Sequence, residues 1–477
     1  MPGDDKRKKP KRDKPSPPGH GRLSASDYTG ATHRPCSHPS HQAGELCPLC
    51  CAGRLYPYKT KQQIQLHGHA PVSATCWDVD VLRCATCKAV FNAREPSTKY
   101  DASVKTSIVL SRYYLGLPFH RLDTFQKLVG VPLPDATQWD LAKQLFEDVF
   151  PVFVKLVEHA AQASLMYHDD TGARILSLLE ENKHLSKGAR YGIHSSGFVT
   201  VADHTIVLYF TGRAHAGENL DKLLDFRDEG LAKPTQMSDA SSSNTAKRHL
   251  NKTQRSFCHA HAFRKFKDIV ECFPDPCAVV LHSMGLVFEQ DQTTKAQGLS
   301  DEQRQRYHAE HSGPLLAELK TWMLAQQHDT LTVEPNSALG QAMNYMLKRW
   351  DEFTLFLSVP GVPLDNNIVE RILKRLIMQR KNSLFYANEY SAYVGCVLTS
   401  LIMTGVEAGI NVFDYFNALQ ANRILVAREP ESWLPWHYPK EQGRSPPISP
   451  PASNRPPSAP ARGDRSTAAL AERAVTA

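Results

Sequence analysis

Residues 164–176 read SLMYHDDTGARIL, and this stretch decides the fold. Its first half is apolar and aromatic and runs into two aspartates, which is the pattern of a strand whose polar end lies at the edge of a sheet. Two more strand patterns follow, YGIHSSGFVTVAD at 191–203 and TIVLYFTGRA at 205–214. A helical pattern at 217–230 and a short strand pattern, PTQMSD at 234–239, come next.

Three strands, a helix and a fourth strand form the element order of the RNase H fold. We therefore expect an α+β multidomain protein whose core is an RNase H-like mixed β-sheet. The first and fourth strands of such a sheet are neighbours, so side chains at their corresponding ends converge. Asp169 closes the first strand and Asp239 closes the fourth. Their carboxylates should meet at one edge of the sheet.

A third acid lies far along the chain, in LDNNIVERILKR at 364–375. Residues 365–380 predict an amphipathic helix that carries Glu370 and has an apolar stripe of Ile368, Ile372, Leu373, Leu376 and Ile377. A helix packed across the sheet would bring Glu370 to Asp169 and Asp239. Hard divalent cations prefer oxygen ligands, so these three residues predict a catalytic site for two Mg²⁺ or Mn²⁺ ions, roughly 3.5–4 Å apart.

Asp170 is the alternative to Asp169 as the first metal ligand, because the two stand side by side. In a strand, successive side chains point to opposite faces, so only one of the pair can aim at the site. We expect Asp169 to be the ligand. The 131 residues from Asp239 to Glu370 exceed what a minimal core requires, which predicts an α-helical insertion at about 265–355.

Two Cys-x-x-Cys knuckles, CPLC and CATC, lie near the N-terminus and contain Cys47, Cys50, Cys84 and Cys87. Paired knuckles of this kind can hold tetrahedral Zn²⁺ with four thiolates, so we expect a zinc-ribbon-like module. One ligand could instead come from a neighbouring Cys36, His38, Cys51 or Cys76. The motif CHAHAFRKF at 258–266 has no matching distant pair, and we interpret it as structural, with a basic face near DNA.

With 477 residues, the chain is too long for one ordinary core. We expect these segments in order: a disordered basic tail (1–44), the zinc-binding module (45–97), a helical, helix-turn-helix-like DNA-binding region (98–160), the RNase H-like catalytic domain with its insertion (161–388), a C-terminal helical segment (389–425) and a disordered Pro-rich tail (439–477).

The composition, 41% hydrophobic and 22% charged, is that of a globular protein, and the net charge of +7 gives only a weak indication of a polyanionic partner. The charged N-terminus lacks the apolar core of a secretory signal, which predicts a cytoplasmic location. The longest apolar run, 393–406, is too short to span a membrane and predicts a buried helix. Phosphate-binding loop and serine-elbow motifs are absent from the sequence.

Four blocks, YHDDTGARIL, SDASSSN, CHAHAFRKF and PLDNNIVERILKR, closely resemble in order the motifs of the transposases of insertion sequence family sixty-six. The resemblance covers roughly residues 45–425, and DNNxxER followed by a basic helix is its most specific part. It implies a catalytic aspartate-aspartate-glutamate set at Asp169, Asp239 and Glu370, and it places Arg213 and His215 near that site. The first motif departs from the usual Asp-Glu-Thr, and the second from the usual Asp-Gly-Tyr.

From these features we expect a bacterial DNA transposase that binds element ends, cleaves them and joins them to target double-stranded DNA. It would act on chromosomal or plasmid DNA, as a homo-oligomer and with possible accessory transposition proteins. Two alternatives remain open: a catalytically idle DNA-binding regulator, and an RNase H-fold nuclease that cleaves without joining.

Overall fold

The computed structural model describes residues 43–46, 48–55, 71–76, 81–83, 90–92, 98–329 and 332–439. The chain divides into two compact units. In the first, which includes residues 1–69, the described residues form a turn in which Leu46 and Arg54 make an antiparallel bridge. The second unit includes residues 70–440 and holds all the named strands and helices. Most of both predicted tails lies outside the described residues.

A five-stranded mixed sheet in the order β5-β4-β3-β6-β7 forms the centre of the second unit. Its strands are β3 (Leu165–Gly172), β4 (His194–Val201), β5 (Thr205–Gly212), β6 (Thr235–Ser238) and β7 (Gln254–Phe257). Strands β3, β4 and β5 are antiparallel, whereas β6 runs parallel to β3 and β7 parallel to β6. The expected pairing of the first and fourth predicted strands is confirmed, and the order is consistent with an RNase H-like core. A separate two-stranded ladder joins β1 (Val81–Arg83) and β2 (Val90–Asn92).

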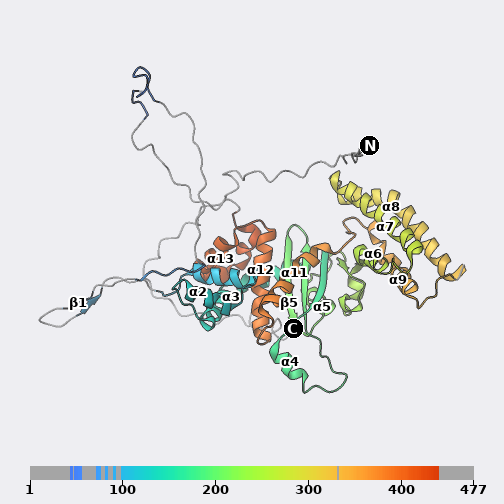
Figure 1. The fold of residues 1–477 in the computed structure, drawn as a ribbon, viewed down its shortest axis with the longest axis horizontal. Helices are drawn as coiled ribbons and strands as arrows, with labels where there is room; N and C mark the ends of the chain where they lie inside the picture. Colours follow the sequence, from blue (N-terminus) through green and yellow to red (C-terminus); the bar gives the residue numbers. More distant parts are fainter. Residues whose placement is uncertain are drawn as a thin grey trace, which may run out of the picture. The chain divides into compact units, whose positions relative to one another are not determined.

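Helix α11 (Asn367–Ser383) is the predicted amphipathic helix, and it lies across the sheet (Figure 1). Its buried side chains, among them Ile372 and Leu373, pack with Val199 and Tyr209 of the sheet. A Cβ atom added at Gly197 of β4 would come within 2.8 Å of Leu373. The glycine therefore permits α11 to lie close to the sheet. Glu370, in the first turn of α11, is brought toward the sheet with it.

The other face of the sheet packs against helices that precede the strands, lie between them and follow them in the sequence. Helix α3 (Asp135–Gln162) and helix α5 (Ala216–Leu224) share one hydrophobic core with Met166, Phe198 and Leu208 of the strands. Helices α1 (Ala102–Val109), α12 (Glu389–Glu407) and α13 (Val412–Ala421) contribute to the same core. Helix α2 (Phe119–Leu128) precedes α3, and a turn at Gly130 with φ of +75° separates them.

Helix α12 covers the outer edge of β5. Its Ser400 and Thr404 hydroxyl oxygens accept hydrogen bonds from the backbone N–H groups of Tyr209 and Val207. Covering an edge strand in this way satisfies donors that would otherwise pair with another chain. The buried helix predicted from the apolar run at 393–406 is confirmed. Among the described helices, none is long and apolar enough to cross a membrane.

The stretch between β7 and α11 is mainly helical, as expected for the insertion. It contains α6 (His259–Lys267), α7 (Pro274–Ala296), α8 (Asp301–Leu324), α9 (Ala338–Leu347) and α10 (Trp350–Phe353). Helices α7 and α8 lie side by side as a long pair (Figure 1). This stretch has a hydrophobic core of its own, which includes Met284, Leu319 and Phe353. It can therefore hold its shape while its first helix, α6, contributes to the site described below.

Candidate metal centre at the strand ends

Asp169 lies within β3, three residues before its end rather than at the end as the sequence predicts, and Asp239 directly follows the neighbouring parallel strand β6. One side chain contacts both. The Nδ2 atom of Asn244 donates to Oδ1 of Asp239 at 2.5 Å and to Oδ1 of Asp169 at 3.2 Å. The backbone N–H groups of Asp170 and Ser241 donate to the same two oxygens. The two carboxylates are thus held close together, with few other donors to offset their repulsion.

Asn244 is itself fixed by the buried face of β3. Its backbone carbonyl accepts a hydrogen bond from Nε2 of His168, with 2.6 Å between the atoms. Burial lowers the pKa of His168, so the ring is a neutral donor at neutral pH. The residue before Asp169 therefore anchors the loop that carries Asn244.

Glu370 extends from α11 toward His261 of α6. Oε1 of Glu370 lies 3.5 Å from Nε2 of His261. The start of α11 is tied to both neighbours: Asn366 donates its side-chain amide to the carbonyl of His168 at 3.1 Å and its backbone N–H to Sγ of Cys258 at 3.2 Å. These bonds set the position of Glu370 relative to β3 and α6.

Electrostatics indicate that a cation would be favourable here. Burial, together with the nearby charge of Asp239, raises the pKa of Asp169 to about 6. The hydrogen bonds from Asp170 and Asn244 and the proximity of His261 oppose this rise in the pKa without cancelling it. Within the described residues, the buried Oε1 of Glu370 and Nδ1 of His261 have no hydrogen-bond partner. An acceptor of this kind is satisfied by a ligand that carries positive charge.

A cleft opens beside Asp239, which is the one of the three predicted acids among its lining residues. The rest of its lining is the loop after Asp239, His261, Arg264 and Lys265 of α6, Asp268 directly after α6, and Tyr345 of α9. The Tyr345 hydroxyl oxygen accepts a hydrogen bond from the N–H of Ala240 at 3.1 Å, and the ring lies 4.5 Å from Nζ of Lys265. Acidic and basic side chains thus share one solvent-open cleft.

Asp170 faces away from this cleft, as the alternation along the strand predicts. Its Oδ1 accepts a hydrogen bond from the Ser196 hydroxyl at 2.6 Å. Its Oδ2 lies 3.0 Å from Nδ1 of His215 and accepts the N–H of Ala216, at the start of α5, at 2.9 Å. Arg213 contacts Asn182 and the carbonyl of Arg190 rather than any of the three predicted acids.

The structure brings two further residues to the acids that the sequence did not assign there. In CHAHAFRKF, Cys258 and His259 are buried, in agreement with a structural role, but His261 faces Glu370. His259 and His261 are two residues apart and so lie on different sides of α6. This spacing is the sequence feature that could have indicated different roles for the two histidines. Asn244, the last residue of SDASSSN, gave no signal of its own. Of the predicted zinc ligands, Cys47, Cys84 and Cys87 lie outside the described residues, and Cys50 is exposed.

Residues 97–393, more than half of the chain, match the family model described as Transposase IS66 family. The chain belongs to this family. The matched segment of this IS66-family transposase contains Asp169, Asp239 and Glu370 and begins after the cysteine knuckles.

Two curated relatives come from Sinorhizobium fredii (strain NBRC 101917 / NGR234). Uncharacterized protein y4jD is 25% identical over 375 residues, which cover 75% of this chain and 71% of the relative. Uncharacterized protein y4hP is 24% identical over 340 residues, which cover 67% of this chain and 60% of the relative. The names of these two relatives assign no role to any residue.

Proposed function

We propose that this IS66-family transposase cleaves DNA at the ends of its element and joins those ends to target DNA, with Asp169, Asp239 and Glu370 as ligands for Mg²⁺ or Mn²⁺. The observation that carries the proposal is the single amide of Asn244, which donates to both Asp169 and Asp239. The two carboxylates share this neutral amide and each accepts one backbone N–H besides, so no cation offsets their two negative charges among these donors. A divalent cation supplies the missing charge.

The donor set fits such a cation. Three carboxylates offer only oxygen ligands, which Mg²⁺ and Mn²⁺ prefer over softer sites. Oε1 of Glu370 lacks a hydrogen-bond partner among the described residues, and the pKa of Asp169 is raised; both are explained if these groups bind a cation in the working enzyme. A bound pair of metal ions would activate water or a DNA 3′-hydroxyl as the nucleophile and would stabilise the leaving oxygen.

The protein's own residues then have separable tasks in the proposed reaction. Asn244 holds the two aspartates at a fixed spacing, and His261 orients Glu370. Arg264 and Lys265 contribute positive charge to the cleft that adjoins Asp239, where they would bind a phosphate of the DNA backbone. Phosphoryl transfer depends mainly on such positioning and electrostatic stabilisation, because the protein forms no covalent bond to the substrate.

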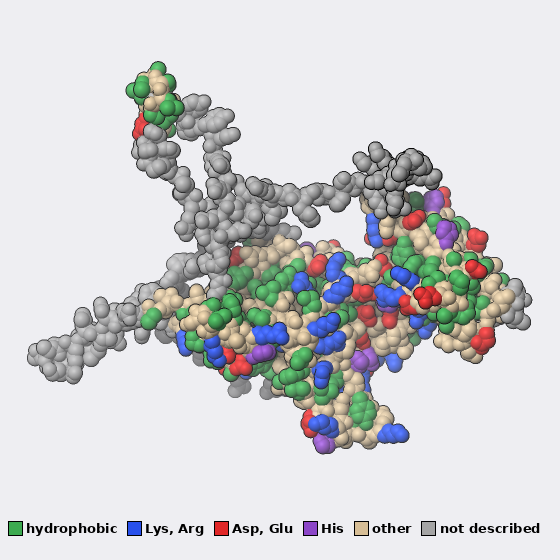
Figure 2. All heavy atoms as spheres, in the orientation of Figure 1, with side chains coloured by type: hydrophobic (Ala, Val, Ile, Leu, Met, Phe, Trp, Pro, Cys, Tyr) green, Lys and Arg blue, Asp and Glu red, His purple; other side chains and the backbone are tan. Residues whose placement is uncertain are grey.

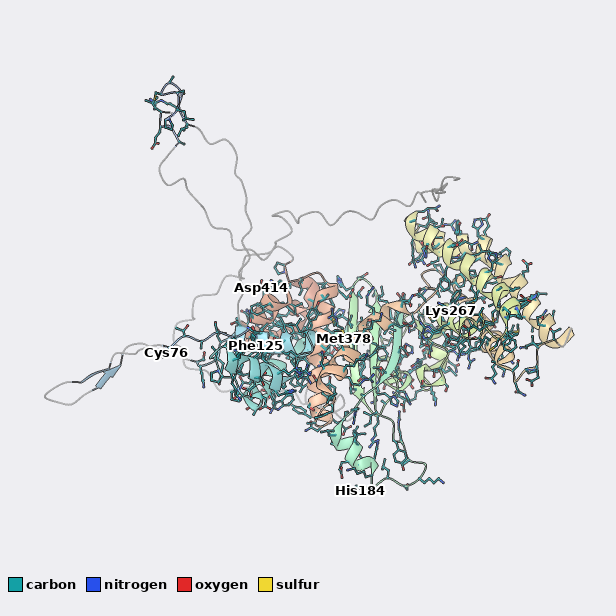
Figure 3. All side chains as sticks on the ribbon, in the orientation of Figure 1. Cys76, Phe125, His184, Lys267, Met378 and Asp414 are labelled. Carbon is teal, nitrogen blue, oxygen red and sulfur yellow. The ribbon has the colours of Figure 1, made fainter. Side chains whose placement is uncertain are left out.

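Helix α11 offers a surface for the rest of the DNA. Its exposed face carries Arg371, Lys374 and Lys381, one or two turns apart, beyond the turn that carries Glu370. Figure 2 shows Lys and Arg side chains gathered over α11 on the face in view, and Met378, on the same exposed side of the helix, is labelled in Figure 3. Lys and Arg side chains gathered on one face can neutralise backbone phosphates of double-stranded DNA.

The proposal includes pairing of two element ends by a homo-oligomer and a Zn²⁺ site at Cys47, Cys50, Cys84 and Cys87. The zinc part is tested by measuring metal content in protein purified without chelator. Close to one zinc per chain from these ligands supports it, and a ratio near zero refutes it.

The catalytic part is tested by incubating the full-length protein with Mg²⁺ and DNA fragments that carry the sequences flanking its gene. We expect nicked and joined products from the unaltered protein. Asp169→Asn, Asp239→Asn and Glu370→Gln should each abolish both products, while Asp203→Asn, which alters an exposed acid between β4 and β5, should leave both unchanged. Nicking without joining would indicate the nuclease. Binding without either product would indicate the idle regulator.

A further inference from the structure

On the opposite face of β3 from Asp169, three potential metal ligands from three elements meet. They are Asp170 near the end of β3, His194 at the start of β4 and His215 immediately before α5. One ligand atom from each lies within 4.8 Å of the others. We propose that these residues form a second, separate metal site, which binds a transition-metal dication such as Zn²⁺.

The contacts between the three side chains are close to those that an ion would need. Oδ2 of Asp170 lies 3.0 Å from Nδ1 of His215, and the rings of His194 and His215 have centroids 3.8 Å apart with 36° between their planes. Bonds of about 2.0–2.2 Å from nitrogen and oxygen to Zn²⁺ set tetrahedral ligand atoms roughly 3.3 Å apart. Because the three ligand atoms already lie within 4.8 Å of one another, side-chain rotations that bring the more distant atoms closer by up to about 1.5 Å would bind the ion.

The sheet leaves room for these rings. In the strand register, His194 stands between Gly172 of β3 and Gly212 of β5, so no cross-strand side chain crowds it. A Cβ atom added at Gly212 would meet no atom within 4 Å. At Gly192, by contrast, an added Cβ atom would collide with the His194 ring, so the ring packs directly over that glycine. The imidazole is thus confined on one side and open on the other.

Neighbouring groups hold the ligands in orientation, as in natural metal sites. The Ser196 hydroxyl donates to Oδ1 of Asp170 and accepts a hydrogen bond from the side-chain amide of Asn219 at 2.9 Å. The N–H of His215 donates to Glu218, whose carboxylate pairs with Arg190. Glu218 thus offsets the positive charge of Arg190, which lowers the pKa of His194.

The protonation state of His194 and the partial exposure of Asp170 and His215 also favour metal binding. Burial, followed by the neighbouring His215, lowers the pKa of His194, which favours the neutral imidazole that binds metals. The Asp170 side chain is 13% exposed and that of His215 35% exposed, so an ion can enter from solvent and keep a water ligand.

The chemistry of the donors separates this site from the catalytic acids. Two imidazoles and one carboxylate suit Zn²⁺, Co²⁺ or Ni²⁺, whereas the all-oxygen set at Asp169, Asp239 and Glu370 suits Mg²⁺ or Mn²⁺. A bound ion would link β3, β4 and the start of α5 one residue away from Asp169. Its expected role is to brace the strand that carries that acid, and its existence does not depend on the proposed transposition activity.

The test is to count Zn²⁺ bound by metal-stripped full-length protein and by its His194→Asn and His215→Asn variants. His184→Asn is the matched control, because His184 is an exposed histidine just after helix α4 (Leu176–Asn182) (Figure 3). We expect each of the first two variants to bind one equivalent fewer than the unaltered protein and the control, or to bind it at least about tenfold more weakly. Equal stoichiometry and affinity in all four proteins would overturn the proposal.

A second measurement covers the case in which either asparagine variant folds poorly. His194→Cys replaces one ligand by another, so Co²⁺ added to this variant should produce a sulfur-to-cobalt charge-transfer absorption beyond that of the unaltered protein. The absence of any added absorption in folded His194→Cys protein would contradict the site. Loss of the added absorption in His194→Cys/His215→Asn protein would identify His215 as the companion ligand.

Discussion

Oε1 of Glu370 on α11 lies 3.5 Å from Nε2 of His261 on α6. The two residues are 109 positions apart in the sequence and are brought together because the segments that carry them share hydrogen bonds, from the N–H of His259 to the carbonyl of Leu364 and from the N–H of Asn366 to Sγ of Cys258. The helical insertion therefore begins with a helix that contributes directly to the candidate site. His261 is a positioning residue in this arrangement, because it acts on Glu370.

Replacing His261 by Asn should lower the rate of DNA strand cleavage by about 10- to 100-fold, the usual cost of losing a partner that orients a metal ligand. The cleavage rate is measured at several Mg²⁺ concentrations, and the Mg²⁺ needed for half-maximal rate should rise. His282→Asn alters an exposed histidine on α7 and should change neither quantity. An unchanged Mg²⁺ requirement in His261→Asn would argue against the positioning role.

Replacing Asn244 by Asp should make the fold more dependent on divalent cations. The change removes the shared donor and adds a third negative charge beside Asp169 and Asp239, which a bound cation offsets. Thermal unfolding with and without Mg²⁺ or Mn²⁺ should show a larger metal-induced rise in midpoint for Asn244→Asp than for the unaltered protein. Asn251→Asp, at an exposed position, is the control. An equal or smaller rise in Asn244→Asp would contradict the geometry of the site.

Gly217 on α5 should not tolerate a side chain. An added Cβ atom would collide with the carbonyl oxygens of Thr245 and Ser243, which flank Asn244 in the chain. Gly217→Ala should therefore cost about 1–3 kcal/mol of unfolding free energy and reduce cleavage, because the Asn244 loop must move. Gly285→Ala, in open space within α7, should instead stabilise the protein by about 0.5–1 kcal/mol. Chemical denaturation measures the unfolding free energy of each variant. Equal changes in unfolding free energy for Gly217→Ala and Gly285→Ala would contradict this account.

The buried side chain of His259 should make the unfolding free energy depend on pH. Burial lowers its pKa from 6.5 to about 4, against the hydrogen bond from Nε2 to the carbonyl of Phe353. Between these pH values the unfolded chain binds a proton that the folded chain excludes. The unfolding free energy should therefore fall as pH drops from 6.5 to about 4, by up to about 1.4 kcal/mol per pH unit.

His259→Gln keeps a donor for Phe353 but has no group that titrates in this range. Denaturation curves at several pH values should show a shallower decline for His259→Gln than for the unaltered protein. His282→Gln, on the exposed side of α7, should retain the full decline. A decline in His259→Gln as steep as that of the unaltered protein would assign the pH dependence to other groups.

The sequence predicts the centre of the fold because its signals are local and strong. The strand β3 and the helix α11 have apolar patterns of period 2 and 3.6, and the pairing of β3 with β6 follows from the order of the elements. The opposite orientations of Asp169 and Asp170 follow from the same alternation. That Asp169 rather than Asp170 is the catalytic ligand remains a prediction.

The sequence does not predict strand β7 because QRSF is four residues long, has three polar residues, and pairs on one side only, with β6. His261 and Asn244 were missed as partners of the acids for a different reason. Their positions depend on long-range bonds, such as those from the N–H of Asn366 to Cys258 and from His168 to the Asn244 carbonyl. No local pattern records a contact between segments that are 76 or 108 residues apart.

The most direct test of the central claim is a Mn²⁺ titration of the full-length protein, followed by the electron paramagnetic resonance signal of free Mn²⁺. The account predicts that Asp169→Asn, Asp239→Asn and Glu370→Gln each weaken binding at the site by at least about tenfold, while Asp203→Asn does not. If all four variants bind Mn²⁺ as the unaltered protein does, these three carboxylates do not form a metal site, and the proposed mechanism is wrong.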